Sequence, residues 1–142
     1  MKKVRVFAWL LAGIAPVVSA TEPFCGGAPH AIDVDYAAEV DRSGGVTFDM
    51  REAQGRANER WDAELNRVYR DLLAALPAAD QDRLRTAQRA WLAFRDAELA
   101  FAESETIAGG GTMAPLVVND IAMGLLRDRT CALSRHRKAL AP

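Results

Sequence analysis

The sequence predicts an all-α fold: a three-helix antiparallel array preceded by an irregular N-terminal arm. Three long segments place apolar residues every three or four positions, which is the period of an amphipathic helix. Pro77 separates the first segment from the second, and the glycines at 109–111 separate the second from the third. Both residue types interrupt helices, so the segments should form three helices within one domain.

The first twenty residues are predicted to be a secretory signal peptide. Basic residues near the start precede an apolar run over 6–18, and the small residues Val18 and Ala20 mark a cleavage site. The run is too short for a membrane anchor, and no later segment is apolar enough to span a bilayer. We therefore expect cleavage after Ala20, a periplasmic or secreted protein, and no stable membrane insertion.

Removal of the signal peptide changes the charge balance. It takes away three of the 18 basic residues and none of the 19 acidic ones, so the mature chain carries a formal charge of −4. A mildly acidic chain is a poor nucleic-acid binder and suits a cationic partner.

The two cysteines, Cys25 and Cys131, are expected to pair with each other. Secreted proteins mature in an oxidising compartment, where an isolated pair of cysteines forms a disulfide. The closed loop would exceed 100 residues, which stabilises the fold by roughly 4–5 kcal/mol in the chain-entropy model. Such a bridge would tie the N-terminal arm to the third helix.

The positions of glycine and proline and the period of the apolar residues predict the organisation after the signal peptide. The arm covers residues 21–46, where glycine and proline are frequent and only Ala31–Val40 could form a short element. The helical domain covers residues 47–142, with helices expected over 47–76, 80–108 and 112–140. The apolar stripe of the first helix comprises Met50, Ala53, Ala57, Trp61, Leu65, Val68, Leu72 and Leu76, and that of the third comprises Leu116, Val117, Ile121, Leu125, Ala132 and Leu133.

Polar residues interrupt the stripes of the first two helices at matching heights. A short connection makes these helices antiparallel neighbours. Residues at equal distances from the turn then lie opposite each other. The resulting pairs are Asp62 with Arg95, Asn66 with Trp91, and Tyr69 with Gln88. Arg95 and Arg129 lie at stripe centres and need acceptors, because a buried guanidinium cannot lose its proton. Asp62 is the expected acceptor for Arg95, and Arg129 is expected near the Asn66–Trp91 layer.

This set of polar residues is interpreted as an interhelical network that fixes the register of the helices. The alternative is a binding pocket or an acid/base pair built from the same residues. Its members are Asp62, Asn66, Tyr69, Gln88, Trp91, Arg95 and Arg129.

The chain resembles the LprI-type lysozyme-inhibitor domain family from about Phe48 to Leu133. The motifs that carry the resemblance are Asp62-x-x-Leu65-Asn66-x-x-Tyr69, Ala87-Gln88-x-x-Trp91-x-x-x-Arg95-Asp96, Gly110-Gly111-Thr112-Met113-Ala114-Pro115, and Arg129. Members usually carry cysteines where this chain has Ala53, Leu99 and Ile121, so no bridge pattern is carried over. The resemblance implies an envelope protein that acts in defence by binding lysozyme.

The connection between the second and third helices is the predicted partner-binding site. Its residues are Glu98, Glu103, Glu105, Gly109, Gly110, Gly111 and Thr112. The loop could enter a partner's cleft, and its acidic charge suits a basic lysozyme; a helix connection with a solvated acidic end is the simpler interpretation.

The leading functional interpretation is a secreted binding protein that inhibits a lysozyme-like enzyme by occupancy. The alternative is a structural or stress-related envelope module with another protein partner. An enzyme is disfavoured, because no nucleophile–base pair is apparent. No cofactor and no metal site are expected, since His30 and His136 lie far apart without a cysteine or carboxylate cluster.

Overall fold

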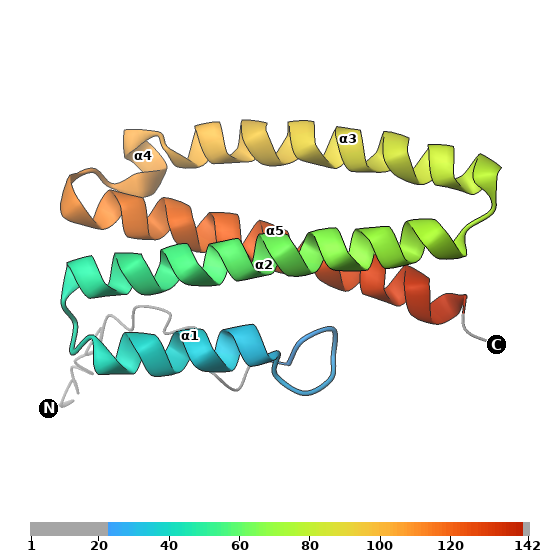
Figure 1. The fold of residues 1–142 in the computed structure, drawn as a ribbon. Helices are drawn as coiled ribbons and strands as arrows, with labels where there is room; N and C mark the ends of the chain where they lie inside the picture. Colours follow the sequence, from blue (N-terminus) through green and yellow to red (C-terminus); the bar gives the residue numbers. More distant parts are fainter. Residues whose placement is uncertain (1–22, 141–142) are drawn as a thin grey trace, which may run out of the picture.

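The structure is a computed structural model that describes residues 23–140, so the predicted signal peptide lies outside the described residues. Over this range it is helical with no strand, which confirms the all-α class (Figure 1). The elements are α1 (Ala31–Arg42), α2 (Thr47–Ala75), α3 (Ala78–Ala102), α4 (Glu105–Ala108), the 3₁₀ turn η1 (Gly111–Met113) and α5 (Ala114–Ala139). Within the same residues, no helix combines the length and apolarity needed to cross a membrane.

The long helices lie side by side, and α1, α2 and α3 alternate in direction (Figure 1). After the turn at α4 and η1, α5 returns in the same general sense as α2 and crosses it. The most extensive helix–helix contact is between α2 and α5. The core residues that are at most 2% exposed include Trp61 and Leu65 of α2 and Leu133 of α5. The α2 stripe therefore faces the core as its periodicity predicts.

The short element that the sequence allowed over residues 31–40 of the arm is present as α1, which extends to residue 42. Ile32 and Tyr36 are spaced by one helical turn and are buried in the core cluster beside α2. His30 caps the start of the helix, and its Nδ1 accepts a hydrogen bond from the Ile32 backbone N–H at 3.3 Å. Burial of this short apolar stripe stabilises a segment that its glycine-rich and proline-rich surroundings do not favour.

The sequence predicted that α3 packs closely against α2 as an antiparallel pair, and the structure differs. Only Ala102 is buried on α3, whereas Phe94 and Phe101 are more than half exposed. The apolar face of α2 is covered by α5, which buries Met123, Leu126 and Leu133. Because α5 occupies that face, α3 makes few contacts with α2 and packs mainly on α5.

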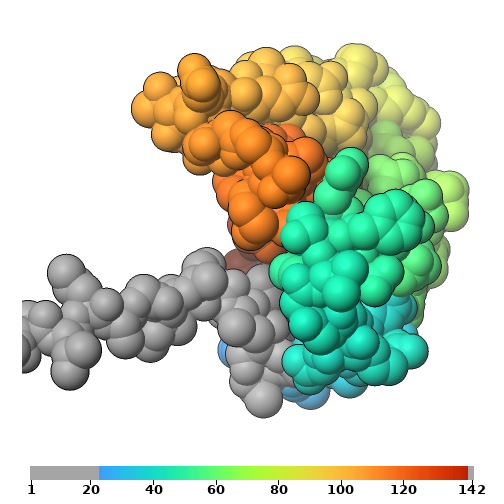
Figure 2. Space-filling view, turned by 90° about the vertical axis from the view of Figure 1, so that its left-hand side faces the viewer, coloured from blue at the N-terminus to red at the C-terminus, as the bar shows by residue number. Residues whose placement is uncertain are grey.

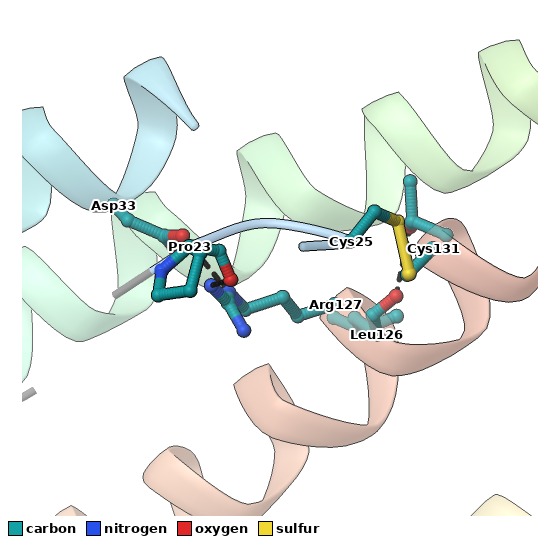
Figure 3. The surroundings of a disulfide bond; sticks show 7 residues. Pro23, Cys25, Asp33, Leu126, Arg127 and Cys131 are labelled. Carbon is teal, nitrogen blue, oxygen red and sulfur yellow. Dashed lines mark hydrogen bonds and ion pairs between the residues drawn. A yellow bond between two sulfur atoms is a disulfide. The ribbon is translucent and has the colours of Figure 1, made fainter. Parts of the chain in front are cut away.

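A buried carboxylate joins three helices. Asp33 of α1 is 2% exposed. One of its oxygens accepts a hydrogen bond from the Trp61 indole N–H at 3.1 Å, and the other accepts from the Arg127 Nε–H at 2.8 Å. Arg127 also donates to the Pro23 carbonyl at 3.2 Å (Figure 3). The sequence did not reveal this ion pair, which fixes α1 against both α2 and α5.

The predicted Cys25–Cys131 disulfide is present beside this ion pair (Figure 3). It joins Cα atoms 5.4 Å apart across 106 positions of sequence. The adjacent Phe24 ring packs on the Trp61 ring with centroids 5.2 Å apart. The segment before α1 is therefore held to the core by a covalent bond and by aromatic contact.

Replacing Asp33 by alanine should lower the free energy of unfolding by about 3 kcal/mol, because Arg127 loses its buried acceptor. Asp35→Ala is the matched control on the same helix. It removes an exposed ion pair with Arg60, which is worth less than about 1 kcal/mol. Urea unfolding of the two variants measures both effects, and equal losses would contradict the buried role of Asp33.

Protein made in an oxidising compartment should contain no free thiol. Alkylation without reduction should leave its mass unchanged, and reduction should expose Cys25 and Cys131 together. The Cys25→Ser/Cys131→Ser variant should have a free energy of unfolding that is lower by about 2–5 kcal/mol, because the long loop is no longer closed. Two alkylated thiols before reduction would show that the bridge does not form.

Candidate functional site

The connection between α3 and α5 is built around three consecutive glycines. Gly109, Gly110 and Gly111 have φ values of 75°, 69° and 65°, in the region that L side chains rarely adopt. They turn the chain sharply between α4 and η1. The sequence predicted this use of the glycines, but α3 ends at Ala102 and the short α4 precedes the turn.

The segment 103–113, which we call the tip, projects at one end of the molecule (Figure 2). Glu103, Glu105 and Thr112 are exposed, as are the apolar residues Ile107 and Met113. The structure shows no ion pair for either glutamate among the described residues. The tip thus combines uncompensated negative charge with exposed apolar side chains.

Glu98 lies at the last turns of α3 and is half-buried, so it differs from the two tip glutamates. It also has no ion pair within residues 23–140. The predicted partner-binding residues therefore occupy one end of the molecule, with Glu98 set back from the most exposed positions.

The expected ion pair between Asp62 and Arg95 is wrong. Arg95 donates to its neighbour Asp96 at 2.7 Å, and Asp62 accepts from the Asn66 amide at 3.0 Å. Asp62 and Asn66 are exposed rather than buried between the helices. The cause is the position of α5, which covers the core face of α2 and keeps α3 away from it.

The same residues instead border a groove of about 320 Å³ between α2 and α3. Its walls are formed by Asp62, Leu65, Asn66, Tyr69, Arg85, Gln88, Arg89, Trp91, Leu92 and Arg95. Six of the residues in the proposed interhelical network line this groove, and the seventh, Arg129, lies next to it. The predicted network residues are thus close together, but they form the walls of an open site.

Arg129 reaches the groove from α5. Its Nε–H donates to the Gln88 side-chain oxygen at 3.0 Å, and its guanidinium carbon lies 5.9 Å from the centre of the Trp91 ring. The Arg95 guanidinium lies 5.5 Å from the same ring. Burial lowers the pKa of Arg129 from its usual range, although an arginine remains protonated. Trp91 is therefore contacted by two cationic side chains.

Sequence reasoning missed polar residues of α2, one buried and one half-buried, whose side chains bond to the backbone of α5. The Gln54 amide donates to the Leu116 carbonyl at 3.0 Å, and the Asn58 amide donates to the Asn119 carbonyl at 3.2 Å. Asp33 was missed because it lies in the arm. Its signal was its place next to Ile32, three residues before Tyr36 and on the same helical face.

No group of three or more histidine, cysteine, aspartate or glutamate residues within the described range could hold a metal ion. The His30 ring caps α1 and packs against the Trp61 ring with centroids 4.6 Å apart. The two notable surfaces of the described residues are therefore the acidic tip and the groove.

The chain is similar to known proteins at the level of a family. A family model described as lysozyme inhibitor LprI matches residues 38–133. An uncharacterized protein of Rhizobium meliloti (strain 1021) is 33% identical over 125 residues, which covers 79% of this chain and 77% of that protein. No solved structure gives a significant match.

Asp62→Ala should change the free energy of unfolding by less than about 1 kcal/mol. The reason is that Asp62 is exposed and its side chain bonds only within its own helix, to Asn66. Urea unfolding measures the change. A loss comparable to that expected of a buried ion pair would mean that Asp62 and Arg95 are paired after all.

Proposed function

The chain belongs to the lysozyme inhibitor LprI family, and we propose that it binds and inhibits a lysozyme-like muramidase outside the cytoplasm. The predicted signal peptide supports that location. The inhibition would arise from occupancy of the enzyme by a folded protein rather than from a reaction.

The observation that carries this proposal is the acidic tip. Glu103 and Glu105 are exposed and have no ion pair in the described part of the chain, so their charge is available to a partner. Lysozymes are generally basic, and opposite charge speeds encounter between proteins. The negative charge of the mature chain acts in the same direction.

The tip also offers the apolar contact that charge alone does not supply. Ile107 is 39% exposed and Met113 is 54% exposed on either side of the glycine turn. Apolar residues at the centre of a contact with charged residues around it match the usual anatomy of protein interfaces. The flanking helices α3 and α5 hold the turn on a rigid base, which limits the entropy lost on binding.

The direct test is residual muramidase activity measured against increasing concentrations of the mature protein. Goose-type, chicken-type and invertebrate-type lysozymes should be compared, because the family does not identify which one is bound. Inhibition of at least one enzyme at micromolar protein supports the proposal. No inhibition of any of them would leave an envelope module with another protein partner as the better account.

Reversing the charge at Glu103 and Glu105 to lysine should lower the association rate with an inhibited lysozyme by on the order of tenfold at low salt. The rate should also become less sensitive to salt, since electrostatic attraction is screened by ions. The free energy of unfolding should stay the same, because both side chains are exposed and form no ion pair with any described residue.

The matched control reverses two exposed acids away from the tip, Glu59 and Asp128, which show no ion pair in the described residues. It changes the net charge by the same amount. Surface plasmon resonance at two salt concentrations compares the two variants. Equal rate losses in both would show that total charge, and not the tip, governs association.

A further inference from the structure

The groove between α2 and α3 has the size and chemistry of a small-ligand site. Its volume of about 320 Å³ lies at the lower end of the range for ligand pockets. Leu65, Trp91 and Leu92 give it an apolar surface, while amide and hydroxyl groups of Asn66, Gln88 and Tyr69 give it hydrogen-bonding groups. It is formed by the middle of the helices and is separate in sequence from the tip.

The arginines around the groove outnumber the acids that could neutralise them. Arg85 is paired with Asp82, and Arg95 is paired with Asp96. Arg89 donates to the Thr86 hydroxyl at 3.1 Å and has no carboxylate partner within residues 23–140. Arg129 likewise has no carboxylate partner there.

Arg129 carries a specific unmet donor. Its Nη2 is buried and has no hydrogen-bond partner among residues 23–140, although its Nε–H is bonded to Gln88. A buried donor on a charged group without an acceptor is costly and rare in folded proteins. The guanidinium lies against Gln88 and Trp91, which both line the groove, so its positive charge lies directly behind the groove wall and attracts an anion bound there.

Another large hollow in the described part of the chain does not have this excess of arginines. It measures about 470 Å³ and lies between the end of α1 and the start of α2. Its lining holds three acids, Glu39, Asp49 and Glu52, against the two arginines Arg42 and Arg56, so negative charge is in excess there. The groove differs from it in charge, because three arginines and one acid line the groove.

The presence of Asp62 in the groove favours a singly charged anion over a doubly charged one. Asp62 lies on the α2 wall and would repel a doubly charged phosphate more than a singly charged carboxylate. A carboxylate also matches the planar guanidinium, with which it forms paired hydrogen bonds. Asp62 can in turn accept from a hydroxyl or amide N–H of the same ligand.

We propose that the groove binds a small carboxylate-bearing molecule, with its carboxylate held by Arg129 and Arg89 and its body against Trp91 and Leu92. A sugar acid and the C-terminus of a short peptide share this chemistry. The site is independent of lysozyme inhibition and can exist whether or not the tip binds an enzyme.

The test is a titration of the disulfide-bonded mature protein followed by two-dimensional NMR. Two probes carry the carboxylate, glucuronate and N-acetyl-alanyl-alanine, and each has a neutral counterpart, glucose and the peptide's C-terminal amide. At least one acid should shift the Trp91 indole signal and bind at least tenfold more tightly than its counterpart. The acid that does so identifies the source of the carboxylate.

Two variants assign the binding to the arginines. Arg89→Gln and Arg129→Gln should each weaken binding of the acid by about tenfold, since each removes one charged contact. Arg89 is exposed, so its replacement leaves the fold intact even if that of Arg129 does not. Arg70→Gln, at an exposed position of α2 outside the groove, is the control and should bind as the parent does.

Three results would overturn the proposal. The first is that neither acid shifts signals from the groove at millimolar concentration. The second is that the neutral counterparts bind as well as the acids, or that Arg89→Gln binds as the parent does. The third is that inorganic phosphate binds more tightly than either carboxylate, because the argument from Asp62 would then fail.

Discussion

The structure depends on one buried carboxylate, that of Asp33. A charge that is 2% exposed is tolerated only when its oxygens are bonded, and here the Trp61 indole and the Arg127 guanidinium supply the donors. The three residues belong to α1, α2 and α5, so the bonding geometry fixes these helices relative to one another. The nearby disulfide then holds the segment before α1 to α5.

The position of α5 follows from this anchor and explains the open side of the molecule. Arg127 and Arg129 are two residues apart, which places them on opposite sides of the helix. Arg127 bonds toward α1, whereas Arg129 bonds to Gln88 of α3. Because α5 contacts both neighbours, α3 packs on α5 and is left away from α2. The groove results from that separation. It is a candidate site because Arg89 and Arg129 beside it have no carboxylate partner among the described residues.

Much of the fold could be predicted from local patterns. Helical periods located the long helices, three glycines located the turn before η1, and a chain with two cysteines left one pairing within the molecule. The motif residues also gave the family. These inferences rest on spacing along the chain or on counting, so they did not depend on how the helices pack.

The interhelical contacts could not be predicted in the same way. The register of Asp62 and Arg95 was inferred from the short turn at Pro77, on the assumption that α2 and α3 pack along their length. That assumption fails because α5 offers Met123, Leu126 and Leu133 to the same face of α2. Competition between two helices for one apolar surface is a property of the whole chain, and a single pair of stripes does not reveal it. The buried role of Asp33 was not predicted for a related reason, because its partners lie in other helices.

The measurement that tests this account most directly is a double-mutant cycle between Asp33 and Arg127. Asp33→Asn keeps the size of the side chain, Arg127→Gln keeps part of the aliphatic stem, and both remove the charge; urea unfolding of the single and double variants gives their coupling. The account predicts a coupling energy of about 2 kcal/mol, because the two groups are bonded in a buried setting. Losses that simply add, to within about 0.5 kcal/mol, would contradict the claim that this ion pair organises the fold.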